Sequence, residues 1–154
     1  MSKESNAELY KIQLNNMGDY IEISTANTGL FDRFVETYKQ IVDTAEDLPR
    51  RYKEIDKARV IPGHENKKVE KIRAKVRFCK ESAEKIDCVF GQGTLQKYFR
   101  EQYEKIPDFM AGTECFIDFF NQMAPVLEKL FGRKVDERDK SSIMSMSQYT
   151  DISN

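Results

Sequence analysis

Near the N-terminus, apolar and polar side chains alternate in two short runs on either side of residues 15–19. The apolar members of these runs are Tyr10, Ile12, Leu14, Ile21 and Ile23. Strict alternation is typical of a strand with one buried face, and residues 15–19 are rich in turn formers. The pattern predicts a β-hairpin over residues 9–24. Because an isolated hairpin is marginal in water, we expect it to lie against an apolar surface.

From residue 30 onward, the apolar positions recur at steps of three and four instead. The stripe consists of Leu30, Phe31, Phe34, Val35, Tyr38, Ile41, Val42 and Ala45. This spacing predicts a helix over residues 28–47. Proline lacks a backbone N–H and clashes with the preceding turn, so we expect Pro49 to break the helix or restart it. Residues 50–60 would then form a second helical piece.

Further helices follow the Pro-Gly loop at residues 61–64. The inner face of a helix over residues 65–89 is predicted to hold Val69, Ile72, Val76, Cys79, Ala83 and Ile86. A short helix is expected over residues 95–103. The last helix opens at Pro107, is rich in phenylalanine, and should be kinked or divided at Pro125.

These elements predict a mainly α fold, a small bundle of four to five helices with an N-terminal β-hairpin along one side. We expect a flexible N-terminus over residues 1–8 and a single helical domain over residues 9–132. Residues 133–154 show no apolar period, which predicts a disordered, mobile C-terminal tail. The predicted core contains Leu30, Phe34, Tyr38, Ile41, Val76, Ile86, Phe90, Phe99, Phe116, Phe120 and Leu127.

The composition indicates a globular protein, with 40% hydrophobic and 33% charged residues in a chain of 154. No apolar run approaches the roughly 20 residues that cross a bilayer, and the N-terminus lacks the layout of a secretory signal. We therefore expect a cytoplasmic protein with no membrane partner. Cys79, Cys88 and Cys115 are too widely spaced for a zinc site, and we expect them to be small buried hydrophobes.

The polar residues do not form a recognisable catalytic set. His64 is the only histidine, and no partner stands at a recognisable spacing from it. Residues 91–94 (GQGT) open a helix whose amides could hold a phosphate, but a helix rather than a strand precedes them, which favours a tight helix-to-helix turn. We expect no enzymatic activity, no catalytic residue, no metal or cofactor, and no small-molecule ligand.

One candidate for partner binding is the basic segment over residues 67–80, which holds seven basic side chains and one acidic one. The candidate contact residues are Lys68, Arg73, Lys75 and Arg77. A plain solvated face is the simplest interpretation, and a surface for an acidic protein is the next. Nucleic acid is least favoured, because the segment contains neither interleaved aromatic residues nor a known reading module.

The other candidate is the surplus of apolar residues on the last helix, namely Phe116, Phe119, Phe120 and Met123. Adjacent residues on a helix point about 100° apart, so Phe119 and Phe120 cannot share one narrow stripe. A fully buried central helix is the slightly favoured interpretation. The alternative is that part of this surface contacts a partner or a second copy of the chain.

Residues 85–99 (KIDCVFGQGTLQKYF) and 115–120 (CFIDFF) resemble a family of small proteins encoded by long-tailed bacteriophages and related prophages of Gram-positive bacteria. In that family a D-x-x-F-G-x-G-T turn, matched here by residues 87–94, leads into a short helix ending in phenylalanine. A final helix of F-x-x-F character closes the domain. The resemblance extends over about residues 9–131. It departs at residues 100–107, where the family usually has a glycine-rich turn.

The resemblance implies a tail assembly chaperone, a non-enzymatic helper in the host cytoplasm that assists virion assembly. Such a protein coats hydrophobic parts of the tape measure protein, keeps it soluble, and recruits tail tube protein. The expected partners are therefore those two proteins, and a second copy of the chain is an open alternative. Two alternatives stay open: a virion structural component, such as a head–tail connector or tail-completion protein, and a nucleic-acid-binding regulator that uses residues 67–80.

Overall fold

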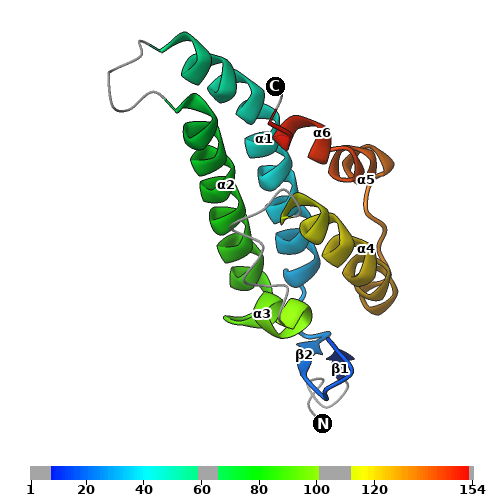
Figure 1. Cartoon of the computed structure of the whole chain (residues 1–154). Coiled ribbons are helices and arrows are strands. Elements are labelled where there is room, and N and C mark those ends of the chain that lie inside the picture. Colours follow the sequence, from blue (N-terminus) through cyan, green and yellow to red (C-terminus); the bar gives the residue numbers. More distant parts are fainter. Residues whose placement is uncertain (1–7, 59–65, 101–111, 153–154) are drawn as a thin grey trace.

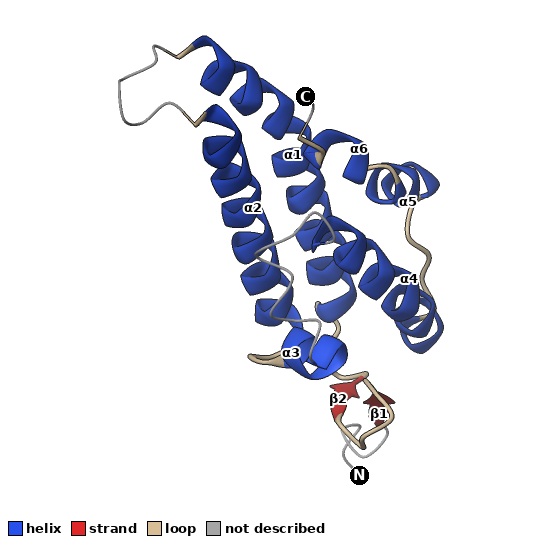
Figure 2. Cartoon of the chain, viewed as in Figure 1, coloured by secondary structure: helices blue, strands red, loops and turns tan. Residues whose placement is uncertain are grey.

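The computed structural model of the chain describes residues 8–58, 66–100 and 112–152. Its elements are β1 (Leu9–Gln13), β2 (Tyr20–Ser24), α1 (Leu30–Lys57), α2 (Lys67–Phe90), α3 (Thr94–Phe99), α4 (Gly112–Phe131), α5 (Glu137–Met144) and α6 (Ser147–Thr150). Two long helices, α1 and α2, run side by side, with the hairpin beyond their lower ends (Figures 1 and 2). The predicted mainly α fold with an N-terminal hairpin is confirmed.

The hairpin is packed by one face, as the alternation predicted. β1 and β2 pair antiparallel, and Ile21 and Ile23 on β2 are buried while Glu22 between them is exposed. The turn is held against the helical part by Asn15, whose side-chain amide donates a 2.7 Å hydrogen bond to the carbonyl of Lys97 on α3. Both apolar burial and this polar contact therefore fix a hairpin that would be marginal alone.

The long helix α1 is continuous over 28 residues, so the predicted break at Pro49 is wrong. The buried face of α1 includes Ala45 and Leu48 before the proline and Tyr52 after it. A proline inside a helix costs about 3 kcal/mol, while burying one large apolar side chain such as Leu48 contributes roughly 1.5–3 kcal/mol. Packing on both sides of Pro49 therefore outweighs the hydrogen bond that it cannot make.

The second helix with an internal proline, α4, is not divided at Pro125 either. The carbonyl that loses its helical partner there belongs to Asn121, which lies on the exposed side of α4. Water can replace the missing hydrogen bond at that position, so the cost is smaller than in a buried turn. The predicted opening of this helix at Pro107 lies outside the described residues.

The C-terminal segment is folded, so the predicted mobile tail is wrong for residues 133–152. This segment forms α5 and α6, and three of its apolar side chains, Val135, Ile143 and Met146, are each at most 3% exposed. These three residues are scattered among many polar ones, which is why no period marks them in the sequence. The segment packs on α1 and α4 and belongs to the same core (Figure 1).

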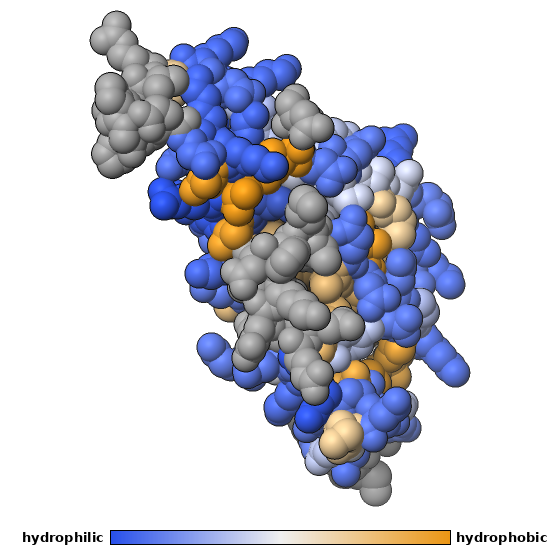
Figure 3. Space-filling view, viewed as in Figure 1, coloured by the Kyte–Doolittle hydropathy of each residue, from blue (hydrophilic) through white to orange (hydrophobic). Residues whose placement is uncertain are grey.

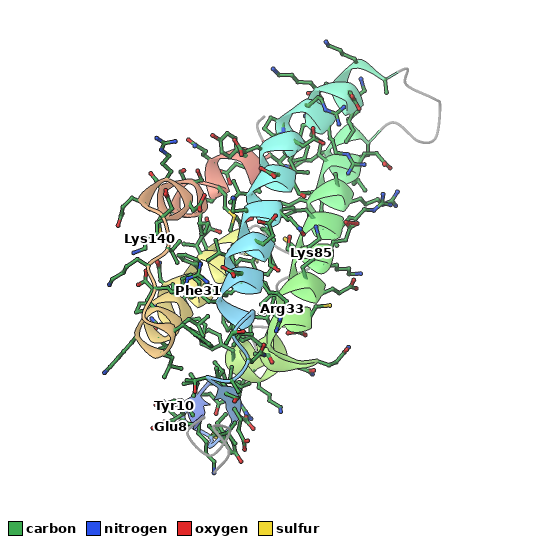
Figure 4. The ribbon with its side chains drawn as sticks, turned by 180° about the vertical axis from the view of Figure 1, so that it is seen from behind. Glu8, Tyr10, Phe31, Arg33, Lys85 and Lys140 are labelled. Carbon is green, nitrogen blue, oxygen red and sulfur yellow. The ribbon has the colours of Figure 1, made fainter. Side chains whose placement is uncertain are left out.

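Polar contacts hold the C-terminal segment in place as well. The Tyr52 hydroxyl on α1 donates a 2.9 Å hydrogen bond to the carbonyl of Thr150. The carboxylate of Glu128 on α4 accepts a 2.8 Å hydrogen bond from the N–H of Val135 and lies 3.3 Å from the ammonium of Lys140. Lys140 extends from α5 toward α4 (Figure 4). Four elements are thereby linked at this side of the bundle.

Aromatic rings fill the core between α1 and α4. Phe34 stacks on Phe120 with 5.4 Å between ring centroids, and the Tyr38 hydroxyl donates a 2.8 Å hydrogen bond to the carbonyl of Phe116. The predicted core residues are buried except for Val76 and Phe90, which are half-buried. The half-buried position of Val76 is the first sign that α2 faces the bundle differently from expectation.

Candidate protein-binding surface

The aromatic face of α4 belongs to the core. Each of its four predicted contact residues is at most 2% exposed: Phe116, Phe119, Phe120 and Met123. Different elements cover the adjacent rings, since Phe120 faces Phe34 on α1 while Phe119 meets Phe90 on α2 and Tyr98 on α3. The fully buried interpretation is therefore confirmed, and the alternative of a partly exposed aromatic surface is wrong.

The D-x-x-F-G-x-G-T segment forms the turn between α2 and α3, and Asp87 is the residue that fixes it. The Asp87 carboxylate accepts hydrogen bonds from the N–H groups of Gly93 and Leu95, at 3.2 and 3.1 Å. Gly91 and Gly93 have φ angles of 117° and 85°, which favour glycine. Because Asp87 already binds these amides, they are not free for a phosphate. The predicted tight helix-to-helix turn is confirmed.

Burial raises the pKa of the Asp87 carboxyl, and the two backbone hydrogen bonds oppose that rise. The capping role of Asp87 was not predicted. The signal for it in the sequence is an acidic residue near the end of one helix, followed by two glycines and then the start of another. The motif is thus explained by local structure, without a catalytic role.

The first half of α2 turns a different face toward α1 than its apolar stripe predicted. Lys71 and Lys75 are only 8% and 3% exposed, whereas Val69 and Ile72 are 37% and 38% exposed. The predicted inner face is therefore wrong for this half of the helix. Lys75 is buried, so it is not the exposed partner contact that was predicted.

Contacts at the end of α1 accompany this orientation. The Lys71 ammonium lies 2.8 Å from the Asp56 carboxylate, and the Lys67 ammonium donates to the Asp56 backbone carbonyl. Asp56 lies in the last turn of α1, where carbonyls lack helical partners and the helix dipole is negative. The lysine stems can pack on α1 while their head groups reach this end. The lysines thus take the place that the aliphatic residues were expected to occupy.

The exposed face of α2 consequently carries aliphatic side chains among basic ones. We call this surface the α2 patch, and it consists of Lys68, Val69, Ile72, Arg73, Val76, Arg77 and Lys80. Its members at four-residue steps, Lys68, Ile72, Val76 and Lys80, form one ridge along the helix. Figure 3 shows hydrophobic surface over α2 among hydrophilic side chains. Three of the four predicted basic contacts, Lys68, Arg73 and Arg77, lie in this patch.

Much of the positive charge of the α2 patch is not neutralised within the described ranges. Arg73 pairs with Glu70, three residues earlier on the same helix, at 2.9 Å. Within residues 8–58, 66–100 and 112–152, no ion pair is formed by Lys68, Arg77 or Lys80. A partner with acidic side chains would supply the missing opposite charges.

Other candidate chemistry does not converge on a site in the part of the chain that the structure describes. These residues include no group of three side chains able to hold a metal ion. Nor do the described helices include one with the length and apolarity to cross a bilayer.

Cys79 is buried, Cys115 half-buried and Cys88 exposed, so the expectation of buried cysteines is wrong for Cys88. Burial raises the pKa of the Cys79 thiol to about 12. His64 lies outside the described residues.

Comparison of the chain with protein-family models, curated proteins and solved structures gave no match. Function must therefore be inferred from the residues themselves. The α2 patch combines exposed aliphatic area with Lys68, Arg77 and Lys80, which have no ion pair among the described residues, and this arrangement is suited to protein binding. Three of its basic members, Lys68, Arg73 and Arg77, were predicted as partner contacts, whereas Val69, Ile72 and Val76 were predicted to lie on the inner face of the helix.

Proposed function

We propose that the protein is a non-enzymatic tail assembly chaperone that binds the tape measure protein in the host cytoplasm and keeps it soluble. The observation that carries this proposal is the α2 patch, where Val69 and Ile72 are more than a third exposed among basic side chains. A protein that holds a hydrophobic helical client needs accessible apolar area. Charges around that area keep the complex in solution.

The resemblance of residues 85–99 and 115–120 to phage tail assembly chaperones supplies the identity of the client. In the structure these residues hold α2 in place, since Asp87 caps α3 and the Phe90 ring lies 5.7 Å from Phe34 and 5.6 Å from Phe119. The segments that carry the resemblance therefore attach the end of the helix that carries the α2 patch to the core. Recruitment of tail tube protein belongs to the same proposal.

Co-expression with a tape measure protein of a long-tailed bacteriophage tests the proposal. The measured quantity is the fraction of tape measure protein left in the supernatant after centrifugation, followed by a pull-down of the complex. We expect the tape measure protein to be soluble only when this chain is present. Equal solubility without the chain would overturn the proposal, and recovery of the chain in purified particles would support a virion structural component instead.

A pair of variants connects this experiment with the α2 patch. Ile72→Ser adds a hydroxyl to the centre of the patch, while Met144→Ser makes a comparable change on α5, where Met144 is 37% exposed. We expect Ile72→Ser to reduce the soluble fraction of the tape measure protein and Met144→Ser to leave it unchanged. Circular dichroism verifies that both variants are folded.

A further inference from the structure

We propose that the α2 patch binds an amphipathic helix whose apolar stripe is flanked by acidic side chains. This inference rests on the proposed function, because it takes the α2 patch as the client site, and it adds the chemistry of the segment that is bound. The partner is defined by two features: aliphatic residues that face Val69, Ile72 and Val76, and carboxylates that reach the basic residues around them.

The positions of the cations determine where the partner must carry charge. Lys68 and Lys80 end the ridge and have no ion pair among the described residues. They are 12 residues apart on one helix, which at 1.5 Å per residue corresponds to about 18 Å. A partner helix of roughly 12–14 residues, with a carboxylate near each end, would pair with both at once.

The centre of the patch determines the apolar part of the partner. Val69, Ile72 and Val76 follow the i, i+3, i+7 spacing with which one helix contacts another. The side chains of Val69 and Ile72 are 37% and 38% exposed, while Lys71 and Lys75 of the same helix are buried. A leucine stripe laid along the ridge would remove this surface from water.

Nucleic acid fits the surface less well, although the same cations would attract it. Binding of single strands uses aromatic side chains on which bases stack, and the members of the α2 patch are aliphatic or basic. The exposed side of α2 also carries Glu70, Glu81 and Glu84, which repel phosphate. An acidic protein segment can place its carboxylates beside the cations and avoid these glutamates.

A second copy of this chain is also disfavoured as the occupant. A two-fold symmetric contact places the same surface on both partners. Two α2 patches facing each other would bring Lys68, Arg77 and Lys80 of one copy against the same basic residues of the other. Like charges at an interface cost several kcal/mol, so the patch does not suit self-association.

The test uses the full chain and a designed probe. The probe is a fluorescein-labelled 14-residue peptide with leucine at helical three- and four-residue steps and glutamate beside the leucines. Its matched control has lysine in place of every glutamate. We expect fluorescence anisotropy to give at least about tenfold tighter binding of the glutamate peptide, with affinity falling as salt is added.

Charge reversal at the ends of the ridge makes the test specific for the α2 patch. The double variant Lys68→Glu/Lys80→Glu should lower the affinity for the glutamate peptide by about tenfold or more and raise the affinity for the lysine peptide. The control Lys129→Glu/Lys134→Glu reverses two exposed lysines at the end of α4 and beyond it, and should change neither affinity. Ile72→Ser should lower the affinity for both peptides, because it alters the apolar contact that they share.

Several results would overturn the inference. These are equal binding of the two peptides, indifference to Lys68→Glu/Lys80→Glu, tighter binding of a DNA duplex than of the glutamate peptide, and a dimer of the full chain that Ile72→Ser dissociates. The proposed function is judged separately. If the tape measure protein stays soluble with the double variant, this inference fails and the chaperone proposal stands. If the glutamate peptide binds but the tape measure protein is not solubilised, the chaperone proposal fails and this inference stands.

Discussion

Both α4 and α2 carry apolar side chains on more than one face, and they differ in what covers the second face. On α4, Phe120 packs on α1 and Phe119 meets Phe90 and Tyr98, so both faces are buried. On α2, Val69 and Ile72 remain exposed in the first half of the helix. An apolar stripe therefore becomes core only where a second element covers it.

The same contrast exists within α2 itself. Near its end, Ile86 is 1% exposed, because α1, α3 and α4 come together there. Near its start, the contact with α1 is made through Lys71 and its ion pair with Asp56. The aliphatic residues of this half are therefore available to a partner, and their loss should affect binding more than stability.

Removal of an aromatic ring from α4 should lower the stability of the protein most. Phe120 is 2% exposed and lies 5.4 and 5.0 Å from the ring centroids of Phe34 and Tyr38. We expect Phe120→Ala to lower the free energy of unfolding by about 3–5 kcal/mol, through lost burial and a residual cavity. Urea denaturation measures this change. A loss below about 1 kcal/mol would mean that the α4 face is not core.

The turn between α2 and α3 should have the next largest effect. Asp87→Ala leaves the N–H groups of Gly93 and Leu95 without their acceptor, so we expect a loss of about 1–3 kcal/mol. Asp87→Asn keeps one acceptor oxygen and should recover part of that stability. The same urea titrations compare the two variants. An equal loss in both would show that hydrogen bonding by this side chain does not hold the turn.

The stability of the protein should depend on pH through Glu128, near the C-terminal end of α4. Burial raises the pKa of this carboxyl, but the N–H of Val135 and the ammonium of Lys140 favour its charged form more, so the pKa is lowered from 4.5. The folded-state pKa is below the unfolded one. The stabilisation is therefore complete above about pH 4.5 and is lost as the pH falls through the lowered value.

Glu128→Gln keeps an acceptor for Val135 but removes the charge that Lys140 faces. We expect it to lower the free energy of unfolding by about 1 kcal/mol at pH 7, and by less at pH 3. Denaturation of both proteins at the two pH values measures the difference. A loss that is the same at pH 3 and pH 7 would contradict the assigned charge effect.

The smallest effect is expected at the α2 patch. Ile72→Ala should change the free energy of unfolding by no more than about 0.5 kcal/mol, because the side chain is 38% exposed and alanine favours helix. The matched variant on the same helix is Ile86→Ala, which should cost about 2–5 kcal/mol. Comparable losses at the two positions, measured by urea denaturation, would contradict the distinction between the two halves of α2.

The hairpin and the helices could be predicted because their signals are local. Alternation around Glu22 and the three- and four-residue steps in α1 each lie within one element. The outcome at Pro49 could not be predicted in the same way. It depends on a competition between one lost hydrogen bond and the burial of Leu48 and Tyr52 by distant elements.

The remaining differences come from contacts between residues far apart in the chain. Tyr52 holds Thr150 across 98 residues, and this contact helps to fold a segment that has few apolar residues. Lys71 contacts Asp56, 15 residues earlier in the chain, and with this contact α2 turns a basic face toward α1. The basic part of the α2 patch could therefore be found from the sequence. The aliphatic part of the patch could be identified only from the orientation of α2 in the structure.

Methyl NMR of the full chain, titrated with the glutamate peptide, tests most directly whether the α2 patch is the partner surface. We expect the methyl signals of Val69, Ile72 and Val76 to shift with saturating behaviour, while those of the buried Leu127 and Ile143 stay in place. Saturating shifts at core methyl groups of α4 or α5, with those of the α2 patch unchanged, would contradict the account.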